Sequence, residues 1–421
     1  METATGCATT KAPVLHGLAL AVTILLVSCL PLKGVADTFD PRSLIDNGGF
    51  LVDRSDSSFG YRQHDQFIPA STLKILTSLA AINILGKEYR FTTLFFVDRQ
   101  ENLFIKGSGD PFLTSEAVLH IARELKQRGV VRVNTLFLDD TSFALGNPML
   151  PGVKVPPSSN PYDAPSSGLA VNFNSLPVKK TGTGLISPGE PQTPLLPLMK
   201  DAGRTLPKGD FRINIATAPV PGKMSPSLRY AGELFQAQLE KAGITVKRGF
   251  GRRQTPPRLN EKGQPLYIYR GQKSLQEIIE QCLKYSNNFI ANQLFLAIGM
   301  KVYGEPARWD KSRRVMAEFI DKILKTKKGT VRVVDGSGLS RDNKITCATL
   351  VAILDRFRPY AHLLPRKRGH LVKSGTLDGV YCYAGYLESK KKLCPFALLL
   401  NQEENSRDAL LTRLAALVHH E

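Results

Sequence analysis

Strand patterns stand at both ends of this sequence, and helical patterns fill the stretch before the second of them. Residues 49–66 alternate as a β-hairpin does, and strand patterns return at 370–388 and 394–400. Apolar residues recur at helical spacing in the segments 273–284, 288–300, 309–325, 346–357 and 406–419. This order is best accommodated by one antiparallel sheet, completed by both ends of the chain and covered by helices.

Residues 91–270 have a different character. Their opening run, 91–97, is strand-like, and Pro/Gly-rich stretches follow at 147–168 and 181–222. Helical spacing at 115–127 and 229–242 excludes a simple linker. This region therefore reads as a large inserted α+β domain.

We predict an α+β fold in which residues 37–90 and 271–421 form one discontinuous domain, interrupted by the inserted domain at 91–270. A chain of 421 residues is long enough for more than one core. With 42% hydrophobic and 22% charged residues, its composition is that of an ordinary globular protein.

The first 36 residues read as a signal peptide, because Lys11 precedes an apolar run at 17–27 that is too short to span a bilayer. We favour cleavage before Asp37, after a run of small residues. The box ending in Cys29, at which lipoproteins are cut and acylated, is the alternative, and an uncleaved membrane anchor is a third. We expect export to the periplasm or cell envelope, with membrane attachment if Cys29 is lipidated.

Four cysteines follow position 37: Cys282, Cys347, Cys382 and Cys394. None has the C-x-x-C spacing or a related spacing of a metal site. We expect buried thiols or an occasional disulfide, no metal and no other cofactor.

The formal net charge of +19 raises the question of an anionic partner. Basic residues are scattered, with short runs only at 366–368 and 390–392, and no aromatic stacking motif accompanies them. This pattern argues against nucleic acid. It favours a solvated basic surface that attracts anionic polymers of the envelope.

A serine and a lysine one helical turn apart supply the first candidate chemistry. A serine becomes a nucleophile when a base takes its proton, and Lys74 at i+3 from Ser71 places an amine within reach of the hydroxyl. Apolar residues surround the predicted helix up to Gly86, so burial should lower the pKa of Lys74 toward that of a useful base. At the helix N-terminus, backbone N–H groups also favour a developing anion.

The Ser-x-x-Lys spacing recurs at Ser389 and Lys392, in an evident turn rich in solvated lysines. Only Ser71 opens a buried helix, so we take Ser71 as the candidate nucleophile. Alone, an N-cap serine followed by a surface lysine would explain this spacing equally well.

Two accompanying motifs, Ser-x-Asn and Lys-Ser/Thr-Gly, decide between these alternatives. Each occurs twice. The early pair, 158–160 and 180–182, lies in Pro/Gly-rich sequence with no room for intervening elements, and we reject it. The late pair is 286–288, between two helices, and 373–376, within a strand pattern, which leaves ample chain to bring both motifs beside Ser71.

With these motifs the chain resembles the D-alanyl-D-alanine carboxypeptidase/endopeptidase family, the low-molecular-mass class C penicillin-binding proteins. The likeness spans nearly all of the chain after the signal peptide. Its segments are Phe67–Lys74, Gly107–Pro111, Tyr162–Pro165 followed by Asn172 and Asn174, Ser286–Ala291, Asp335–Arg341 and Lys373–Val380. The family implies a penicillin-binding/β-lactamase-like (DD-peptidase) catalytic domain, an antiparallel sheet flanked by helices, for the discontinuous domain.

The resemblance also implies a catalytic role for three matching residues. Ser71 attacks the carbonyl between two D-alanines, Lys74 is the base, and Ser286 relays a proton to the leaving amine. Water then hydrolyses the acyl-enzyme. The implied substrates are peptidoglycan peptides and their cross-links, with β-lactam antibiotics as covalent inhibitors.

Substrate binding is implied for the remaining motif residues. Asn288 holds the substrate amide, and the strand of Lys373, Ser374, Gly375 and Thr376 binds the terminal carboxylate. Backbone N–H groups of Ser71 and Thr376 form the oxyanion hole.

Two departures bear on competing functions. Ser374 replaces the usual threonine but keeps its hydroxyl, and Tyr285-Ser286-Asn287 also matches the Y-x-N of some β-lactamases and esterases. The long interval between Ser71 and Ser286 argues against those enzymes. A non-catalytic penicillin-binding sensor of the same fold would be expected to have lost a motif residue, and none is lost.

One candidate contact lies in the inserted domain. Asp139 and Asp140 end the strand-like run 135–138, where either carboxylate could pair with an amine on the third residue of the peptide. A simple turn start explains both aspartates equally well. We include Asp139 among the candidate substrate-binding residues.

Overall fold

The computed structural model describes residues 40–54, 57–146, 151, 158–218, 224–257, 259, 263–326, 329–389 and 392–419. The predicted signal peptide and Cys29 lie outside these residues. Within the described helices, no segment is both long enough and apolar enough to cross a membrane.

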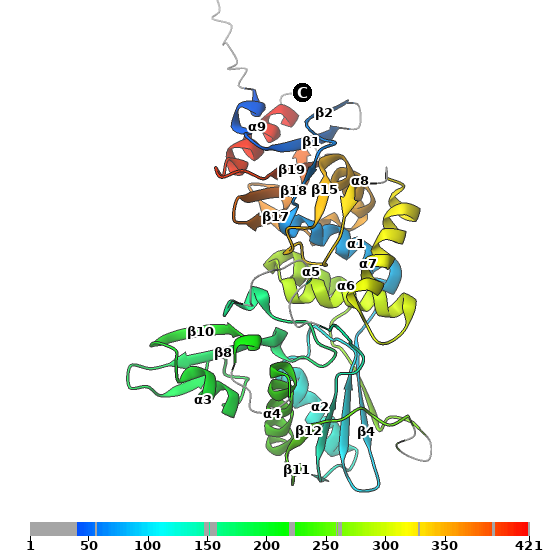
Figure 1. The fold of residues 1–421 in the computed structure, drawn as a ribbon, viewed down its shortest axis with the longest axis vertical. Coiled ribbons are helices and arrows are strands. Elements are labelled where there is room, and N and C mark those ends of the chain that lie inside the picture. Colours follow the sequence, from blue (N-terminus) through cyan, green and yellow to red (C-terminus); the bar gives the residue numbers. More distant parts are fainter. Residues whose placement is uncertain are drawn as a thin grey trace, which may run out of the picture. The chain divides into compact units, whose positions relative to one another are not determined.

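A six-stranded antiparallel sheet joins the two ends of the chain, as predicted (Figure 1). Its order is β16-β17-β18-β19-β1-β2. The strands are β1 (Gly48–Arg54), β2 (Ser57–Tyr61), β16 (Arg366–Lys367), β17 (His370–Leu377), β18 (Val380–Ser389) and β19 (Lys392–Leu400). The pairing of Gly48 with Leu400 places the first strand beside the last one, so neither end of the chain completes the sheet alone.

Helices follow the predicted segments closely. They are α1 (Lys74–Leu85), α5 (Leu275–Tyr285), α6 (Asn288–Tyr303), α7 (Trp309–Phe319), α8 (Cys347–Phe357) and α9 (Arg407–His419). Local capping fixes the starts of α5, α6 and α8. Ser274 and Glu277 form a capping box that starts α5, and the Asn287 side chain caps α6. Gly86, at φ 89°, ends α1.

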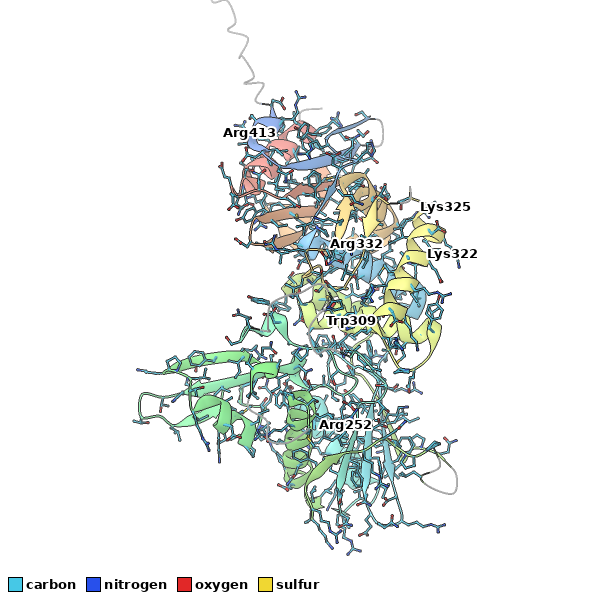
Figure 2. All side chains as sticks on the ribbon, in the orientation of Figure 1. Arg252, Trp309, Lys322, Lys325, Arg332 and Arg413 are labelled. Atoms are coloured by element: carbon cyan, nitrogen blue, oxygen red, sulfur yellow. The ribbon has the colours of Figure 1, made fainter. Side chains whose placement is uncertain are left out.

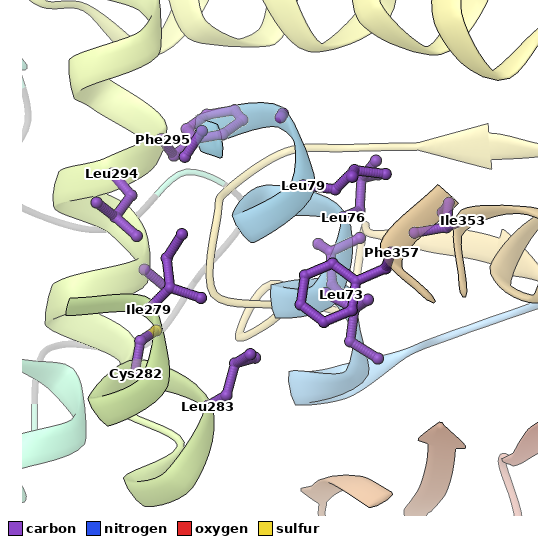
Figure 3. Packing of buried hydrophobic residues seen from close by; sticks show 14 of the residues in the cluster. Leu73, Leu76, Leu79, Ile279, Cys282, Leu283, Leu294, Phe295, Ile353 and Phe357 are labelled. Carbon is purple, nitrogen blue, oxygen red and sulfur yellow. The ribbon is translucent and has the colours of Figure 1, made fainter. Parts of the chain in front are cut away.

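Side chains alternate between the two faces along each strand, so each face of the sheet packs into a different hydrophobic core. Leu399 belongs to a large cluster with α1, α5, α6 and α8, whereas Leu398 belongs to a smaller cluster that α9 covers. Figure 3 shows side chains of the large cluster, among them Leu73, Leu76, Leu79, Ile279, Leu283, Leu294, Phe295, Ile353 and Phe357. Truncating a fully buried member such as Leu76 to alanine should cost about 2–5 kcal/mol of stability.

Residues 92–270 build further sheets. A five-stranded mixed sheet has the order β12-β7-β5-β4-β13, a three-stranded one the order β10-β8-β9, and β6 pairs with β11. The strands are β4 (Thr92–Val97), β5 (Leu103–Gly107), β6 (Arg132–Val133), β7 (Leu136–Asp139), β8 (Ser175–Lys180), β9 (Ile186–Pro188), β10 (Gly209–Asn214), β11 (Thr245–Val246), β12 (Phe250–Arg252) and β13 (Tyr267–Arg270). The helices are α2 (Ser115–Gln127), α3 (Pro197–Gly203) and α4 (Pro226–Lys241).

The ends of this region lie side by side. Thr92 pairs with Arg270, and the Gly271 N–H donates to Phe91 O at 2.8 Å. Most of its buried apolar residues, from Phe95 to Tyr269, form a cluster of their own, whereas Ala164 and Ala170 belong to the large cluster. Residues 41–421 nevertheless form one compact unit, and the inserted-domain boundaries stay a prediction.

Two local features differ from the expected elements. The helix expected at 309–325 is α7 followed by a single π turn, Ile320–Leu324, which Lys325 ends in a left-handed conformation. A small sheet of β14 (Val331–Arg332), β15 (Lys344–Thr346) and β3 (Gln66–Phe67) was not expected. Strands of two or three residues are too short to show a periodic pattern.

Two of the cysteines are buried free thiols, and exposed basic residues are scattered, as the sequence predicts. Cys282 and Cys382 are buried, and burial raises the pKa of their thiols to about 11 and about 12. Exposed basic residues are spread over separate elements, as the labelled Arg252, Lys322, Lys325, Arg332 and Arg413 illustrate (Figure 2).

Candidate active site

The Ser-x-x-Lys motif lies where the chain enters α1. Ala70 takes a left-handed conformation, φ 46°, and a short 3₁₀ turn, Ala70–Leu73, leads directly into α1 at Lys74. This turn brings Lys74 Nζ to 2.7 Å from Ser71 Oγ. The candidate nucleophile and the candidate base therefore share a direct hydrogen bond.

Lys74 is fully buried and has three oxygen partners. Its Nζ lies 2.7 Å from Ser71 Oγ, 2.7 Å from Asn288 Oδ1 and 2.8 Å from the carbonyl oxygen of Ser337. An ammonium has three protons to donate, so the charged form is fully satisfied. The neutral amine keeps two donors for Asn288 and Ser337, which turns its lone pair toward Ser71.

The turn that carries Ser337 is organised by one buried carboxylate. Asp335 accepts hydrogen bonds from the backbone N–H groups of Ser337, Gly338 and Ser340, from the Ser337 hydroxyl and from Asn343 Nδ2. Gly338 passes so close to Ala70 O that a Cβ would lie 1.9 Å from it. Only glycine fits there, at φ 83°, and the turn is thereby pressed against the nucleophile.

Burial sets the electrostatics of Lys74. Desolvation lowers its pKa to about 8, although the nearby Cys282 and Asp335 act in the opposite direction. A substantial fraction of Lys74 is then neutral near physiological pH, as a general base requires.

The Ser-x-Asn motif forms the connection between α5 and α6. Ser286 ends α5 in a left-handed conformation, φ 54°, and Asn288 begins α6. Asn288 accepts from Lys74 through Oδ1 and donates from Nδ2 to Tyr162 O at 3.1 Å. The Asn288 amide therefore bridges the candidate base and the 161–163 turn.

Lys373 joins the second motif to the third. It lies on β17, is 1% exposed, and its Nζ donates to Ser286 Oγ at 2.8 Å and to Ser374 O at 2.7 Å. Burial, and after it the positive charge of Lys74, lower the pKa of Lys373 to about 7. Each lysine thus holds one serine of the site.

The strand after Lys373 packs directly against the backbone of Ser71. A Cβ on Gly375 would lie 2.7 Å from Pro69 O and 3.0 Å from Ser71 N, so this position requires glycine. Ser374 is half-buried and Thr376 exposed, and both carry hydroxyls on this strand.

Arg407, at the start of α9, supports this strand. It donates to Gly375 O at 3.0 Å and to Thr376 Oγ1 at 2.6 Å, and its guanidinium lies over the ring of Tyr383. Because Thr376 Oγ1 accepts this bond, its own proton stays available for a ligand. No sequence pattern pointed to Arg407, which lies far from every motif along the chain.

The Asp139 side chain makes its hydrogen bonds within the region 92–270. Its side chain is 1% exposed and is bound by Thr141 N and Oγ1 and by Thr255 N. Burial would raise the pKa of Asp139, but these hydrogen bonds outweigh it and lower the pKa. These hydrogen bonds are those expected of a turn start, and the contact of Asp139 with substrate stays a prediction. Asp140 pairs with Arg252 instead.

Sequence reasoning missed the backbone partners of the site. Ser337 and Tyr162 each contribute a carbonyl oxygen, and Asn292 Oδ1 accepts from Gly336 N within the Asp335 turn. The Asp335-Gly336-Ser337-Gly338 turn was recognisable in the sequence, but nothing there assigned it a partner.

The chain is similar to a known family and to known proteins. Residues 38–201 and 203–363 match the family described as D-Ala-D-Ala carboxypeptidase 3 (S13). The D-alanyl-D-alanine carboxypeptidase DacB of Haemophilus influenzae is 23% identical over 90% of this chain and 88% of its own. A D-alanyl-D-alanine carboxypeptidase of Actinomadura sp. (strain R39) is 26% identical over 85% and 78%, respectively.

Two solved structures of penicillin-binding protein 4 from Haemophilus influenzae have the same fold. One covers 87% of this chain and 93% of its own at 20% identity, with a TM-score of 0.70. The other, complexed with a β-lactam, covers 90% and 99% at 18% identity, with a TM-score of 0.68.

Proposed function

Since the chain belongs to the D-Ala-D-Ala carboxypeptidase 3 (S13) family of serine peptidases, we propose that Ser71 is its nucleophile and that it cleaves D-alanyl bonds of peptidoglycan stem peptides and cross-links. The observation that carries this assignment is the contact of Lys74 Nζ with Ser71 Oγ inside a buried, fully paired environment.

Acylation begins when neutral Lys74 takes the Ser71 proton. Ser71 Oγ then bonds to the carbonyl carbon of the penultimate D-alanine, and backbone N–H groups of Ser71 and Thr376 stabilise the oxyanion. Ser286, bonded to Lys373, delivers its proton to the departing amine, and the C–N bond breaks. The proton that Lys74 took from Ser71 then replaces the one that Ser286 gave, which leaves Lys74 neutral. Water attacks the resulting ester with Lys74 again as base, which releases the shortened peptide.

Substrate recognition is assigned to the other two motifs. Asn288 presents an amide to the peptide backbone beside Lys74. The charge of Lys373 and the hydroxyls of Ser374 and Thr376 bind the terminal carboxylate.

β-Lactams should acylate Ser71 and stay bound. Their strained amide occupies the place of the D-alanyl bond, and the ring-opened product remains tethered, so no leaving group diffuses away. The β-lactam complex of the Haemophilus influenzae relative supports this assignment.

Such a substrate lies outside the cytoplasm. We assign the chain to the periplasm or cell envelope, exported by the segment before Asp37. Its net charge of +19 would favour residence near anionic envelope polymers.

Mass spectrometry of the intact protein tests the nucleophile. Incubation with penicillin should add one stoichiometric adduct to the wild type and none to Ser71→Ala. An adduct of the same size on Ser71→Ala would refute the assignment. Digestion of defined muropeptide monomers and cross-linked dimers would then report whether terminal D-alanine, the cross-link or both are released.

A further inference from the structure

A pair of hydrogen bonds fixes the orientation of the Asn288 amide beside Lys74. Asn288 Oδ1 lies 2.7 Å from Lys74 Nζ, and Asn288 Nδ2 donates to Tyr162 O at 3.1 Å. A carbonyl oxygen only accepts hydrogen bonds, so Tyr162 O holds the Nδ2 side of the amide toward itself. The oxygen of the amide is thereby left facing Lys74.

The opposite orientation of this amide would harm the proposed base in both of its protonation states. Charged Lys74 would lose one of its three oxygen acceptors. Neutral Lys74 would accept a hydrogen bond from Asn288 Nδ2 on the lone pair that must take the Ser71 proton. Asn288 Oδ1 would also face Tyr162 O, and two acceptors repel each other. The carbonyl of Tyr162 therefore decides how Asn288 serves Lys74.

Two buried asparagines hold the loop 158–165, which carries this carbonyl. Asn214, at the end of β10, donates from Nδ2 to Ser158 O at 3.0 Å. Asn174, directly before β8, donates from Nδ2 to Pro165 O at 2.8 Å. Both asparagine side chains are fully buried. The 158–165 loop is therefore anchored at each end by an amide of the larger region that surrounds it in the sequence.

The Asn174 anchor is kept at a cost to stability. Asn172, Phe173 and Asn174 are consecutive residues in the left-handed region, with φ of 46°, 61° and 50°, and this backbone is strained for a bulky residue. The buried Asn174 Oδ1 has no hydrogen-bond partner among the described residues, which is unfavourable. Stability alone would therefore not select this turn, whereas its hydrogen bond to Pro165 has a use at Asn288.

The 158–165 loop also packs against the helix that carries its target. Ala164 is 3% exposed and belongs to the large cluster, together with Phe289 and Ile290 of α6. The loop contacts α6, and α6 begins with Asn288. A displacement of the loop would therefore change the partner of the Asn288 amide.

We propose that Asn174 and Asn214 are positioning residues of the reaction: through the 158–165 loop, they keep the Asn288 oxygen turned toward Lys74. This inference rests on the proposed function, in which Lys74 is the general base. Neither asparagine belongs to the three motifs that supply the candidate catalytic groups. Both act through Asn288.

This role has a consequence for the pH dependence of acylation. Burial lowers the pKa of Lys74 to about 8, and loss of the loop anchors should lower it further, because the ammonium then loses an acceptor that stabilises its charge. The other titratable groups that face the amine are Cys282 on α5, Asp335 in its turn and Lys373 on β17, and all three stay in place. Acylation needs neutral Lys74, so the acid limb of the pH–rate profile should shift to lower pH. A substitution that only loosens the fold would lower the rate without moving this limb.

Asn174→Gly is the first test variant, because it removes the donor while glycine accepts the left-handed backbone. Asn214→Ala releases the other end of the loop. Asn102→Ala is the matched control: Asn102 is 9% exposed, and its amide donates to Asp98 Oδ2 at 2.8 Å and accepts from Thr135 N at 3.1 Å, away from the loop. The measured quantity is the rate of penicillin acylation from about pH 5 to about pH 9, with a thermal melt of each variant to establish folding.

Both variants are also made in an Asn288→Ala background, which separates positioning from a general loss of structure. We expect each single variant to acylate about tenfold more slowly and to shift the acid limb down by about 0.5 pH unit or more. Asn102→Ala should match the wild type. In the Asn288→Ala background neither Asn174→Gly nor Asn214→Ala should cause a further loss, because the amide that they position is gone.

An unshifted acid limb in the folded variants, or a further loss of similar size in the Asn288→Ala background, would overturn the positioning role. If one variant does not fold, the other carries the test. Wild-type protein that forms no penicillin adduct on Ser71 would instead contradict the proposed function, a separate result.

Discussion

The chain contains the same two motifs twice, and only the later pair acquires the surroundings that chemistry needs. Lys373 is almost fully buried and donates to Ser286 Oγ, on the connection between two helices. Lys180, in the early pair, ends β8 and donates to the backbone oxygens of Arg204 and Leu206. Ser158 bonds to Asp163 within its own turn. Matching residue types therefore mean little until burial and convergence are known.

Burial changes what each lysine can do. Desolvation lowers the pKa values of Lys74 and Lys373 to about 8 and about 7, so both titrate within the working range of an enzyme. Convergence then gives each amine a serine partner. Four experiments test the effects of burial and of contacts between the motifs.

The largest effect is expected for Lys74→Ala. Removing the base should slow acylation of Ser71 by penicillin on the order of 100-fold or more, the usual scale of positioned proton transfer. Lys392→Ala, in the second Ser-x-x-Lys match, should acylate at the wild-type rate. Stopped-flow or gel-based acylation kinetics at pH 7.5 measure both, with a thermal melt to establish folding. Unchanged acylation in folded Lys74→Ala would exclude it as the base.

Lys373→Ala removes the lysine of the late pair of motifs. Loss of a charged hydrogen bond to the substrate carboxylate, worth about 1.5–3 kcal/mol, should lower kcat/KM for peptide cleavage roughly 10- to 150-fold. Lys180→Ala makes the same change in the early pair and should alter kcat/KM less than about twofold. Comparable losses in the two variants would mean that the late motif has no special role.

The pH dependence should show both lysines. Acylation needs neutral Lys74, so its rate rises as pH increases toward about 8, whereas carboxylate binding needs charged Lys373 and weakens as pH increases past about 7. We expect a bell-shaped pH profile of kcat/KM, with its maximum between the two pKa values and a few-fold decrease in kcat/KM on either side. Lys373→Ala should lose the alkaline decline, and a profile of identical shape in that variant would contradict the assignment.

Asp110 is a buried carboxylate outside the three motifs. Its substitution should therefore change stability. Its carboxylate accepts from Phe112 N, but Oδ2 has no hydrogen-bond partner among the described residues. Desolvation raises its pKa from 3.8 to about 6, so the stability of the protonated form is present below pH 3.8 and is lost as pH rises through about 6.

Asp110→Asn should remove this pH dependence. Between pH 4 and pH 7 the wild type should lose up to about 3 kcal/mol relative to the variant. Urea unfolding at several pH values measures the difference, with the exposed Asp342→Asn as control. Parallel pH curves for wild type and Asp110→Asn would show that the carboxyl titrates normally.

Much of the fold was predictable because its signals are local. The apolar stretch up to Gly86, the capping residues of α5 and α6, and the alternation in β17–β19 each lie within a few consecutive residues, and each gave an element close to its observed bounds. Placing β1 beside β19 needed only the further argument that strands at both chain ends must share a sheet. The π turn after α7 and the short strand β14 have no such local signal.

The sequence by itself determined which residues are present in which order: Ser71 and Lys74 on one turn, Ser286 and Asn288 between helices, and Lys373 on a strand. Only the tertiary structure decided that Lys74 has three oxygen partners, that Arg407 supports Thr376, and that Asp139 is enclosed by Thr141 and Thr255. Spacing along the chain specifies neighbours within a helix or strand. Burial and hydrogen bonding between distant segments depend on how those elements pack, and the pKa values that make the lysines useful follow from that packing.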